Sequence, residues 1–237
     1  MACGMNRILF EISEIADGIA TCSDTRAEHI LSVLHGEVGQ MLKTGELDGK
    51  IGTGEIVSID GSTVAIRVSH TEESLRPWFD LVLAPPRPRV MKRLLPQLAS
   101  LGVGTIVLVG AKKVEKDFWG ATLLKKENFR PLFVDGLMQA GTSVMPRIET
   151  RRNFRRFVTD ELDALFPTAN RVVGHPGGAS SSSARREGRL LLAVGPEGGW
   201  TDDEVELLES HGFSRYSLGS RILRTDTALV ALVARLM

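Results

Sequence analysis

The sequence GPEGGW, residues 195–200, follows the apolar run LLLAV (190–194) and precedes the polar run TDDE (201–204). The apolar run has the length of a buried strand. The polar run has the spacing of a capping box, and the apolar positions after it predict a helix that ends at Gly212. The glycines therefore stand in a strand-to-helix turn, where open α/β sheets bind ligands. A tight connection without a ligand is the alternative, because glycines also serve chain reversal alone.

Residues 76–237 alternate between strand and helix patterns around this turn. Strands are predicted at 79–84, 105–109, 171–174, 189–194 and 213–218, and helices at 90–101 and 154–166. Such alternation predicts an α/β domain with a largely parallel sheet. Between two of the strands, GGASSSSARREG (177–188) has the composition of a flexible loop.

Residues 1–75 read differently. Strand patterns at 7–10, 51–60 and 63–70 include two β-rich runs around Asp60-Gly61, which is a hairpin signal. These patterns predict a small β-rich domain over residues 1–75, followed by the α/β domain over 76–237.

The net charge of zero conceals an asymmetry between these parts. Residues 1–75 contain 5 Lys and Arg residues against 12 Asp and Glu residues, whereas the remainder contains 24 against 17. Either solvated surface charge is unevenly spread, or the basic second part meets a polyanion such as RNA.

Composition excludes several classes of protein. With 43% hydrophobic and 24% charged residues, the chain can bury a substantial core. Its two cysteines, Cys3 and Cys22, show no disulfide framework and no zinc-ligand spacing, so we expect no metal and a reducing, cytoplasmic compartment. No run reaches the length of a membrane span, and the beginning lacks the apolar region of a signal peptide.

Common nucleotide motifs are also absent. Residues 102–107, GVGTIV, lack the third glycine of a dinucleotide fingerprint and precede a strand instead of following one. The turn at 195–200 has no Walker ending, and no GxSxG elbow occurs.

A second glycine turn lies near the C-terminus. Residues 216–227, YSLGSRILRTDT, run from a strand pattern through Gly219 to a helix start. The following ALVALVARLM (228–237) has one polar residue, Arg235, so its helix must be buried on nearly every side. We expect it to pack within the domain or, as the favoured reason, against a second copy of the chain.

Together these motifs carry a resemblance. AVGPEGGWTDDE (193–204) and SLGSRILRTDTA (217–228) resemble the paired C-terminal motifs of the ribosomal RNA small subunit uridine N3-methyltransferase family, the RsmE type of the SPOUT superfamily. Residues 28–34 and 92–103 resemble further family segments. The resemblance implies a PUA-like β-barrel at the N-terminus, a SPOUT α/β domain with a deep trefoil knot, and a homodimer.

The resemblance also implies a cofactor. S-adenosyl-L-methionine would lie bent between the glycine turns, held mainly by backbone groups, which suits adenine recognition. The resemblance implies cofactor contacts at the two glycine turns, and we add the end of the strand predicted at 105–109. The expected cofactor-binding residues are Leu108, Val109, Gly110, Val194, Gly195, Pro196, Gly199, Leu218, Gly219, Ile222 and Leu223.

The reaction implied is methyl transfer to N3 of a uridine in the decoding-region helix of 16S rRNA. The N3 proton must be lost, so the site needs a proton acceptor or donors that stabilise charge on the uracil oxygens. Arg224 is the candidate cation, and Glu197 or Asp226 is the candidate acceptor or positioning group. Alternatively, Arg224 complements local carboxylates and the acids favour helix dipoles.

Eight basic residues are the candidate contacts with 16S rRNA in the small ribosomal subunit: Lys112, Lys113, Lys116, Arg147, Arg151, Arg152, Arg155 and Arg156. A solvated helix face is the alternative. His175 is expected to be a loop histidine.

Three functional classes remain open. The first is the uridine methyltransferase, or a diverged relative that methylates another RNA site. The second is a non-catalytic RNA- or ribosome-binding protein on the same fold. The third is a small-molecule methyltransferase.

Overall fold

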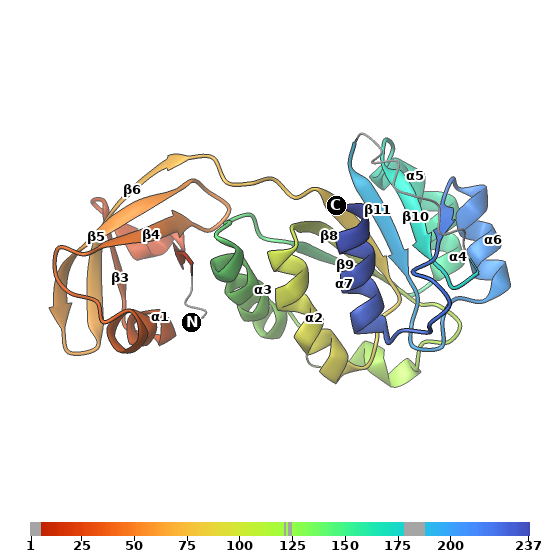
Figure 1. The fold of residues 1–237 in the computed structure, drawn as a ribbon, viewed down its shortest axis with the longest axis horizontal. Coiled ribbons are helices and arrows are strands. Elements are labelled where there is room, and N and C mark those ends of the chain that lie inside the picture. The colour runs from red at the N-terminus through yellow and green to blue at the C-terminus, as the bar shows by residue number, and fades with distance from the viewer. Residues whose placement is uncertain (1–5, 121, 123–124, 178–187) are drawn as a thin grey trace. The chain divides into compact units, whose positions relative to one another are not determined.

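The computed structural model describes residues 6–120, 122, 125–177 and 188–237, so most of the predicted loop 177–188 lies outside them. The chain divides into two compact units. Unit 1 comprises Met1–Arg76 and Phe133–Met145, and unit 2 comprises Pro77–Leu132 and Pro146–Met237. The fold is mixed α/β, with a curled sheet in unit 1 and a parallel sheet in unit 2 (Figure 1).

The sheet of unit 1 has the strand order β1-β4-β5-β6-β3-β2. Strands β1 and β4 are parallel, and the other neighbours are antiparallel. The predictions at 7–10, 51–60 and 63–70 are confirmed by β1, β5 and β6. The strands are β1 (Ile8–Phe10), β2 (Ile15–Ala16), β3 (Ile19–Cys22), β4 (Met41–Glu46), β5 (Ile51–Asp60) and β6 (Thr63–Glu72).

The predicted hairpin joins β5 to β6. Asp60 pairs with Thr63, and Gly61 takes a φ of +57°, a conformation that glycine adopts without strain. The sequence did not predict β3 and β4. Strand β4 contains Gly45, which has low β propensity, so its pattern is weak.

Arg7 joins the returning segment of unit 1 to the sheet. Its Nε donates to the Gly141 carbonyl at 3.0 Å, and its Nη1 donates to the carbonyls of Thr44 and Gly52 at 2.6 and 2.8 Å. The short helices of this unit are η1 (Ile12–Glu14), α1 (Thr25–Glu28) and η2 (His29–Val33).

Unit 2 is built on a sheet in the order β12-β10-β11-β7-β8-β9, in which all neighbours are parallel. The predicted parallel sheet is therefore confirmed. Edge strand β9 was not predicted, because RIETR is largely polar. The strands are β7 (Phe79–Leu83), β8 (Val103–Val109), β9 (Arg147–Arg151), β10 (Asn170–Gly174), β11 (Leu190–Val194) and β12 (Ser214–Tyr216).

The helices of unit 2 largely follow the sequence predictions. Helix α2 begins two residues before the predicted start, because Pro88 suits the first helical position. The helix predicted at 154–166 is confirmed as a continuous stretch with a π turn in its middle. The elements are α2 (Pro88–Ser100), η3 (Lys116–Gly120), α3 (Lys126–Ala140), α4 (Phe154–Arg156), η5 (Phe157–Glu161), α5 (Leu162–Leu165), α6 (Asp202–Ser210) and α7 (Thr225–Leu236). Helix α3 was not predicted, since Pro131 interrupts its pattern and the division between the units falls within it.

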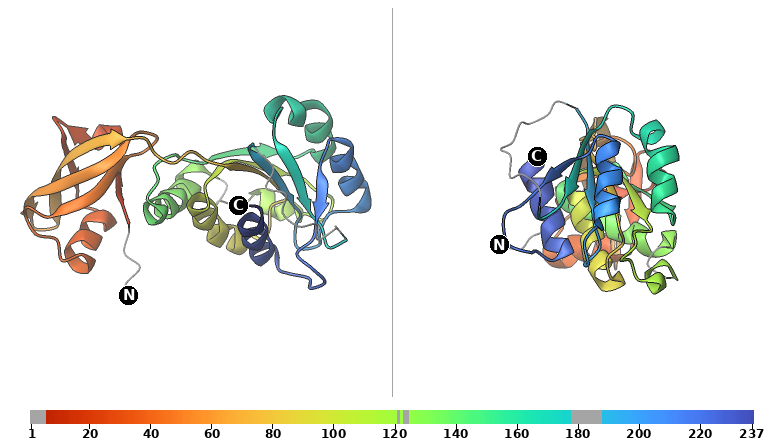
Figure 2. Two further views of the ribbon diagram at one scale, coloured as in Figure 1. Left: turned by 45° about the horizontal axis from the view of Figure 1, so that its top comes forward. Right: turned by 90° about the vertical axis from the view of Figure 1, so that its right-hand side faces the viewer.

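Helices cover both faces of the parallel sheet (Figure 2). One face packs against the α4–α5 stretch and α6, and the core there includes Val107, Leu191, Phe157 and Val205. On the other side, α2 contacts both β8 and α7. This two-sided cover leaves the carboxyl ends of the strands for connecting loops, which is where the site is built.

Within the described ranges, no helix combines the length and apolar character needed to cross a bilayer.

A partly buried arginine, Arg26, organises the start of unit 1. Arg26 donates to Glu14 at 2.5 Å and to Asp24 at 2.7 Å, and its guanidinium lies 5.2 Å from the centre of the Phe10 ring. Hydrogen bonds from Arg26 hold the pKa values of both carboxyl groups below their usual range. These carboxylates therefore stabilise the fold at neutral pH, and that contribution is lost as the pH falls through their lowered pKa values.

We predict that Arg26→Leu lowers the free energy of unfolding by about 1–3 kcal/mol at pH 7, because two carboxylates lose their partner. The difference from the parent protein should shrink at acid pH, as the carboxyls are protonated. Urea unfolding at several pH values measures this. A difference that stays constant from pH 7 to pH 3 would contradict the assigned network.

Candidate functional site

The turn after β11 depends on two glycines for different reasons. A Cβ at Gly195 would lie 3.0 Å from the Trp200 nitrogen and 3.2 Å from the Gly199 carbonyl carbon, so the backbone closes tightly there. Gly199 takes a φ of +68°, which strains other residues. The Gly199 N–H donates to the Pro196 carbonyl at 2.8 Å. The turn is therefore compact, with backbone groups near its surface.

The capping box predicted at the start of α6 is present. The Thr201 N–H donates to Oε2 of Glu204 at 2.8 Å, and the Thr201 side chain accepts the reciprocal bond. The other oxygen, Oε1, accepts from the Lys112 N–H at 2.7 Å. Glu204 is buried, so one carboxylate fixes the helix start and the loop after β8 together.

The loop between β12 and α7 is also held in place. The Ser217 hydroxyl donates to the Pro176 carbonyl at 3.1 Å and accepts from the Gly219 N–H at 3.2 Å. Gly219 takes a φ of +109°. These bonds place this loop beside the segment that follows β10.

The three loops surround a pocket of about 390 Å³ at the carboxyl ends of β10, β11 and β12, which we call the glycine pocket. Parallel strands bring these ends together, so three segments distant in sequence share one site. Its walls come from residues 174–176, 194–200, 216–219 and 221–223, with Thr225, Ala228 and Leu232 of α7; Arg224 does not line it.

Most of the predicted cofactor positions meet in this pocket. Leu108 and Val109 do not line it, because they are buried within β8, and Gly110 lines a different pocket. Gly110 has its own reason to be glycine, since a Cβ there would collide with the Arg152 carbonyl. The predicted residues that line the glycine pocket are Val194, Gly195, Pro196, Gly199, Leu218, Gly219, Ile222 and Leu223.

The three predicted catalytic residues have different surroundings. Glu197 lines the pocket, and its Oε1 accepts from the Arg87 N–H at 3.0 Å, just before α2. Asp226 does not line the pocket. Its Oδ2 pairs with Arg93 of α2 at 2.8 Å, and its Oδ1 accepts from the Thr227 N–H. Arg224 is exposed and precedes the first residue of α7, between the lining residues Leu223 and Thr225.

The sequence reasoning missed several residues of the glycine pocket. His175, Trp200, Tyr216 and Arg221 also line it. The rule that selected Gly195 could have found His175, which follows another parallel strand at the same sheet edge. Trp200 is 5% exposed and its ring centre lies 5.2 Å from that of Phe154, so it packs in the core as well.

Comparisons with known proteins decide the family of this chain. Residues 73–237 match the family model described as an RNA methyltransferase domain. The ribosomal RNA small subunit methyltransferase E of Treponema pallidum is 31% identical over 239 residues, covering 97% of this chain and 90% of the relative. The chain belongs to the ribosomal RNA small subunit methyltransferase E family. A second relative, methyltransferase E 1 of Borreliella burgdorferi, is 27% identical and covers 96% and 95% of the two chains.

Solved structures share the fold of this methyltransferase E family member. The methyltransferase E of Neisseria gonorrhoeae, crystallised with S-adenosyl methionine, has a TM-score of 0.75 at 21% identity and covers 97% and 95% of the two chains. A methyltransferase of Legionella pneumophila, also crystallised with its cofactor SAM, has a TM-score of 0.75 at 23% identity and covers 98% and 96%.

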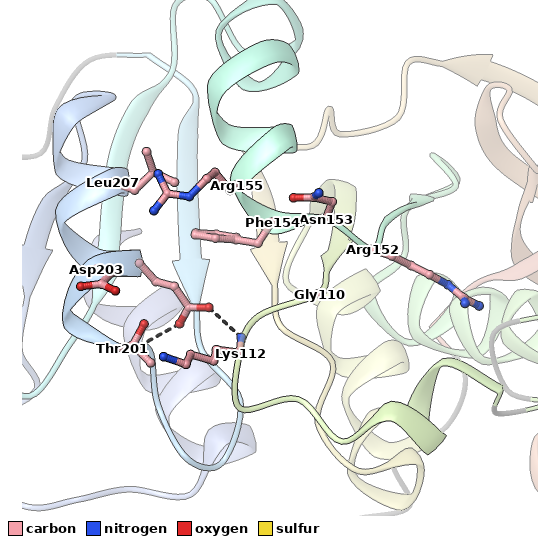
Figure 3. A pocket seen from close by; sticks show the side chains of 10 residues that line it. Gly110, Lys112, Arg152, Asn153, Phe154, Arg155, Thr201, Asp203 and Leu207 are labelled. Carbon is pink, nitrogen blue, oxygen red and sulfur yellow. Dashed lines mark hydrogen bonds between the residues drawn. The ribbon is translucent and has the colours of Figure 1, made fainter.

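In this methyltransferase E family member, three predicted RNA contacts line a second pocket. Lys112, Arg152 and Arg155 border a volume of about 370 Å³ between the starts of α4 and α6 (Figure 3). We call it the α4–α6 pocket. The remaining lining residues are Gly110, Asn153, Phe154, Thr201, Asp203, Glu204 and Leu207.

The other five basic residues lie outside both pockets. Arg151 pairs with Glu161 at 2.5 Å and with Glu149 at 2.9 Å, and the hydrogen bond that it donates to Glu161 raises the pKa of its guanidinium. Lys113 donates to the Gly198 carbonyl at 2.8 Å, which supports the glycine turn. The other three, exposed on different elements, are Lys116, Arg147 and Arg156.

The arginines from 147 to 156 do not share one helix face, because Arg147 and Arg151 belong to β9 and Arg155 and Arg156 to α4.

Among the residues that the structure describes, no three His, Cys, Asp or Glu side chains form a group that could hold a metal ion.

We predict that Glu204→Ala lowers the free energy of unfolding by about 2–4 kcal/mol, because two backbone N–H groups lose their acceptor. Asp202→Ala is the matched control, since Asp202 is exposed in the same helical turn. Removal of the Asp202 carboxylate should lower the free energy of unfolding by only about 0.3–1 kcal/mol, because it loses only its interaction with the helix dipole. Equal costs in urea unfolding would refute the bridging role of Glu204.

Proposed function

We propose that this protein is an S-adenosylmethionine-dependent methyltransferase that methylates N3 of a uridine in the decoding-region helix of 16S rRNA. The observation that carries the proposal is the glycine pocket, in which the two family-like loops, 194–200 and 217–225, come together. Family membership and the names of the Treponema and Borreliella relatives support it. The cofactors crystallised with the Neisseria and Legionella proteins support S-adenosylmethionine.

The residues of the glycine pocket fit this cofactor. The volume of about 390 Å³ lies within the range of small-molecule sites. A side chain at Gly195 would disturb the turn backbone. Because glycine has no side chain there, a ligand can approach the N–H and C=O groups of the turn closely. Leu218, Ile222 and Leu223 add apolar surface on the other side. Ile222 is 90% exposed and therefore available for contact.

When bound, S-adenosylmethionine supplies an electrophilic methyl group on its sulfonium sulfur. Transfer to uracil N3 would exchange the methyl–sulfur bond for a methyl–nitrogen bond, and the N3 proton would have to leave. We assign proton acceptance to Glu197, because it lines the pocket and, among the described residues, its single hydrogen bond is the one that Oε1 accepts from the Arg87 N–H. We assign Arg224 to the uracil oxygens, where a cation stabilises developing negative charge.

Asp226 suits a positioning role better than proton acceptance. Both of its oxygens have donors, Arg93 and the Thr227 N–H. Arg93 lies in α2 and Arg87 directly precedes it, so this one segment supports both Asp226 and Glu197. We infer that α2 keeps the two loops of the pocket at a fixed separation.

Two architectural features belong to the same proposal. Strand β11 lies between β10 and β7 in the sheet, whereas in the sequence it follows β10 and comes long after β7. The chain therefore returns to the middle of the sheet late, which is compatible with a trefoil knot. The curled sheet of unit 1 is compatible with a PUA-like barrel that binds RNA over residues 1–75. A knotted SPOUT domain would then occupy residues 76–237.

We also propose a homodimer through α7. In the part of the chain that the structure describes, the buried residues of this helix are Thr225, Leu229, Leu232 and Val233, which lie on one face. Val230 and Ala231 remain partly exposed, although the sequence predicts a helix buried on nearly every side. Sedimentation analysis should therefore give a mass near twice that of the chain, 25.8 kDa.

The central test is methyl transfer to small ribosomal subunits from a strain that lacks the activity. We expect labelled methyl to appear in 16S rRNA, with N3-methyluridine as the product in nucleoside mass analysis. With a ribosomal substrate, we expect the protein to act in the cytoplasm. Cofactor binding without a product would favour a non-catalytic ribosome-binding protein. Turnover that RNA neither supports nor raises would favour a small-molecule methyltransferase.

A matched pair of glycine variants tests the pocket. Gly199 and Gly212 both have positive φ, +68° and +83°, and a Cβ at either would meet nothing within 4 Å. Alanine should therefore strain each by about 1–2 kcal/mol. We expect only Gly199→Ala, which changes the pocket wall, to weaken cofactor binding measured by calorimetry. A loss of about 1.4 kcal/mol of binding free energy would lower the affinity about tenfold. Equal affinities would locate the cofactor elsewhere.

The role of Arg224 has a kinetic signature. We expect Arg224→Ala to lower kcat by about 100-fold, as removal of one oxyanion donor does, while cofactor affinity stays unchanged. An unchanged kcat would remove Arg224 from the mechanism.

A further inference from the structure

The α4–α6 pocket has the location of a ligand site, distinct from the glycine pocket. Its lining comes from the loop after β8, the loop after β9 with the start of α4, and the N-cap and first two turns of α6. Strands β8 and β9 are parallel and end at Val109 and Arg151, so this pocket also lies at their carboxyl ends. Its volume of about 370 Å³ is in the range of small-molecule sites.

Two cations face this pocket. Figure 3 shows the side chains of Lys112 and Arg155 extending towards α6, and both residues line the pocket. Within the described part of the chain, neither forms an ion pair. Arg152 points away, and its guanidinium lies 5.9 Å from the centre of the Trp119 ring. Cations without a protein partner suit a phosphate group.

The rest of the lining indicates more than a phosphate. Asp203 is exposed at the same rim, and as a carboxylate it accepts hydrogen bonds and repels an isolated anion. Phe154 and Leu207 provide apolar surface. A nucleotide combines an anionic phosphate with a flat base that carries N–H donors, and proteins read single-stranded RNA through such base edges.

The pocket is held in shape by bonds already described or local to it. Glu204 fixes the Lys112 backbone, and the Asn153 side chain accepts from the Arg156 N–H at 3.0 Å at the start of α4. The Phe154 ring packs on Trp200, which lines the glycine pocket. The two pockets therefore adjoin at this aromatic pair, since each is lined by one of the two residues.

We propose that the α4–α6 pocket binds one nucleotide of the RNA substrate, separate from the uridine that is methylated. Its phosphate contacts Lys112 and Arg155, and its base edge donates to Asp203. This assignment rests on the proposed function for the identity of the RNA.

The first test removes the two cations. Lys112→Ala/Arg155→Ala should weaken binding to small ribosomal subunits by about tenfold or more and make the salt dependence shallower, with a slope smaller by about 1. The control Arg89→Ala/Lys92→Ala removes the same charges from exposed positions of α2 that line neither pocket. Equal effects of the two double variants on binding would overturn the proposal.

The second test uses the carboxylate. If the surface attracted RNA only through charge, Asp203→Ala would bind small ribosomal subunits more tightly. If Asp203 recognises a base edge, Asp203→Ala should instead bind subunits more weakly. The control is Asp202→Ala, at the exposed neighbouring position. Tighter binding by Asp203→Ala, or identical effects of the two variants, would overturn the assignment of a base to this pocket.

Binding is measured separately from turnover, so the two proposals fail independently. If the parent protein binds subunits through Lys112 and Arg155 but transfers no methyl group, the proposed function fails and the nucleotide site stands. If methyl transfer proceeds with an unchanged KM for subunits in Lys112→Ala/Arg155→Ala, the nucleotide site fails and the function stands.

Discussion

The carboxylate of Glu204 is the interaction on which both pockets depend. Its two oxygens accept from the N–H groups of Thr201 and Lys112, at the start of α6 and in the loop after β8. A buried carboxylate without donors would be strongly unfavourable, so these two segments must lie where they do. The glycine turn ends against this junction, and the α4–α6 pocket opens beside it.

Two further carboxylates, those of Glu197 and Asp226, hold the loops of the glycine pocket against α2. Glu197 accepts from the N–H of Arg87, directly before α2, and Asp226 pairs with Arg93 within α2. Charges near helix starts often serve the dipole alone, but here each acid joins a pocket loop to another helix. Side chains that the sequence suggests for chemistry thus also carry structure, and only their free oxygens distinguish the two roles.

The basic residues show how tertiary contacts sort a sequence cluster. Of the five arginines between 147 and 156, Arg151 is occupied by Glu149 and Glu161, whereas Arg155 faces a pocket. Lys113, beside Lys112 in sequence, instead supports the Gly198 carbonyl. Neighbours in the chain therefore differ in function because β9, α4 and the loop after β8 point successive side chains in different directions.

Sequence alone determined the parallel sheet of unit 2, the capping box at Thr201 and Glu204, and the two glycine turns, because these depend on local periodicity and backbone conformation. It could not supply β4, β9 or α3, whose weak patterns are stabilised by their neighbours in space. It also could not place His175 or Arg221 in the pocket, nor keep Leu108 and Val109 out of it. Those outcomes depend on which strand ends lie side by side, and strand order is set by long-range pairing that no local pattern encodes.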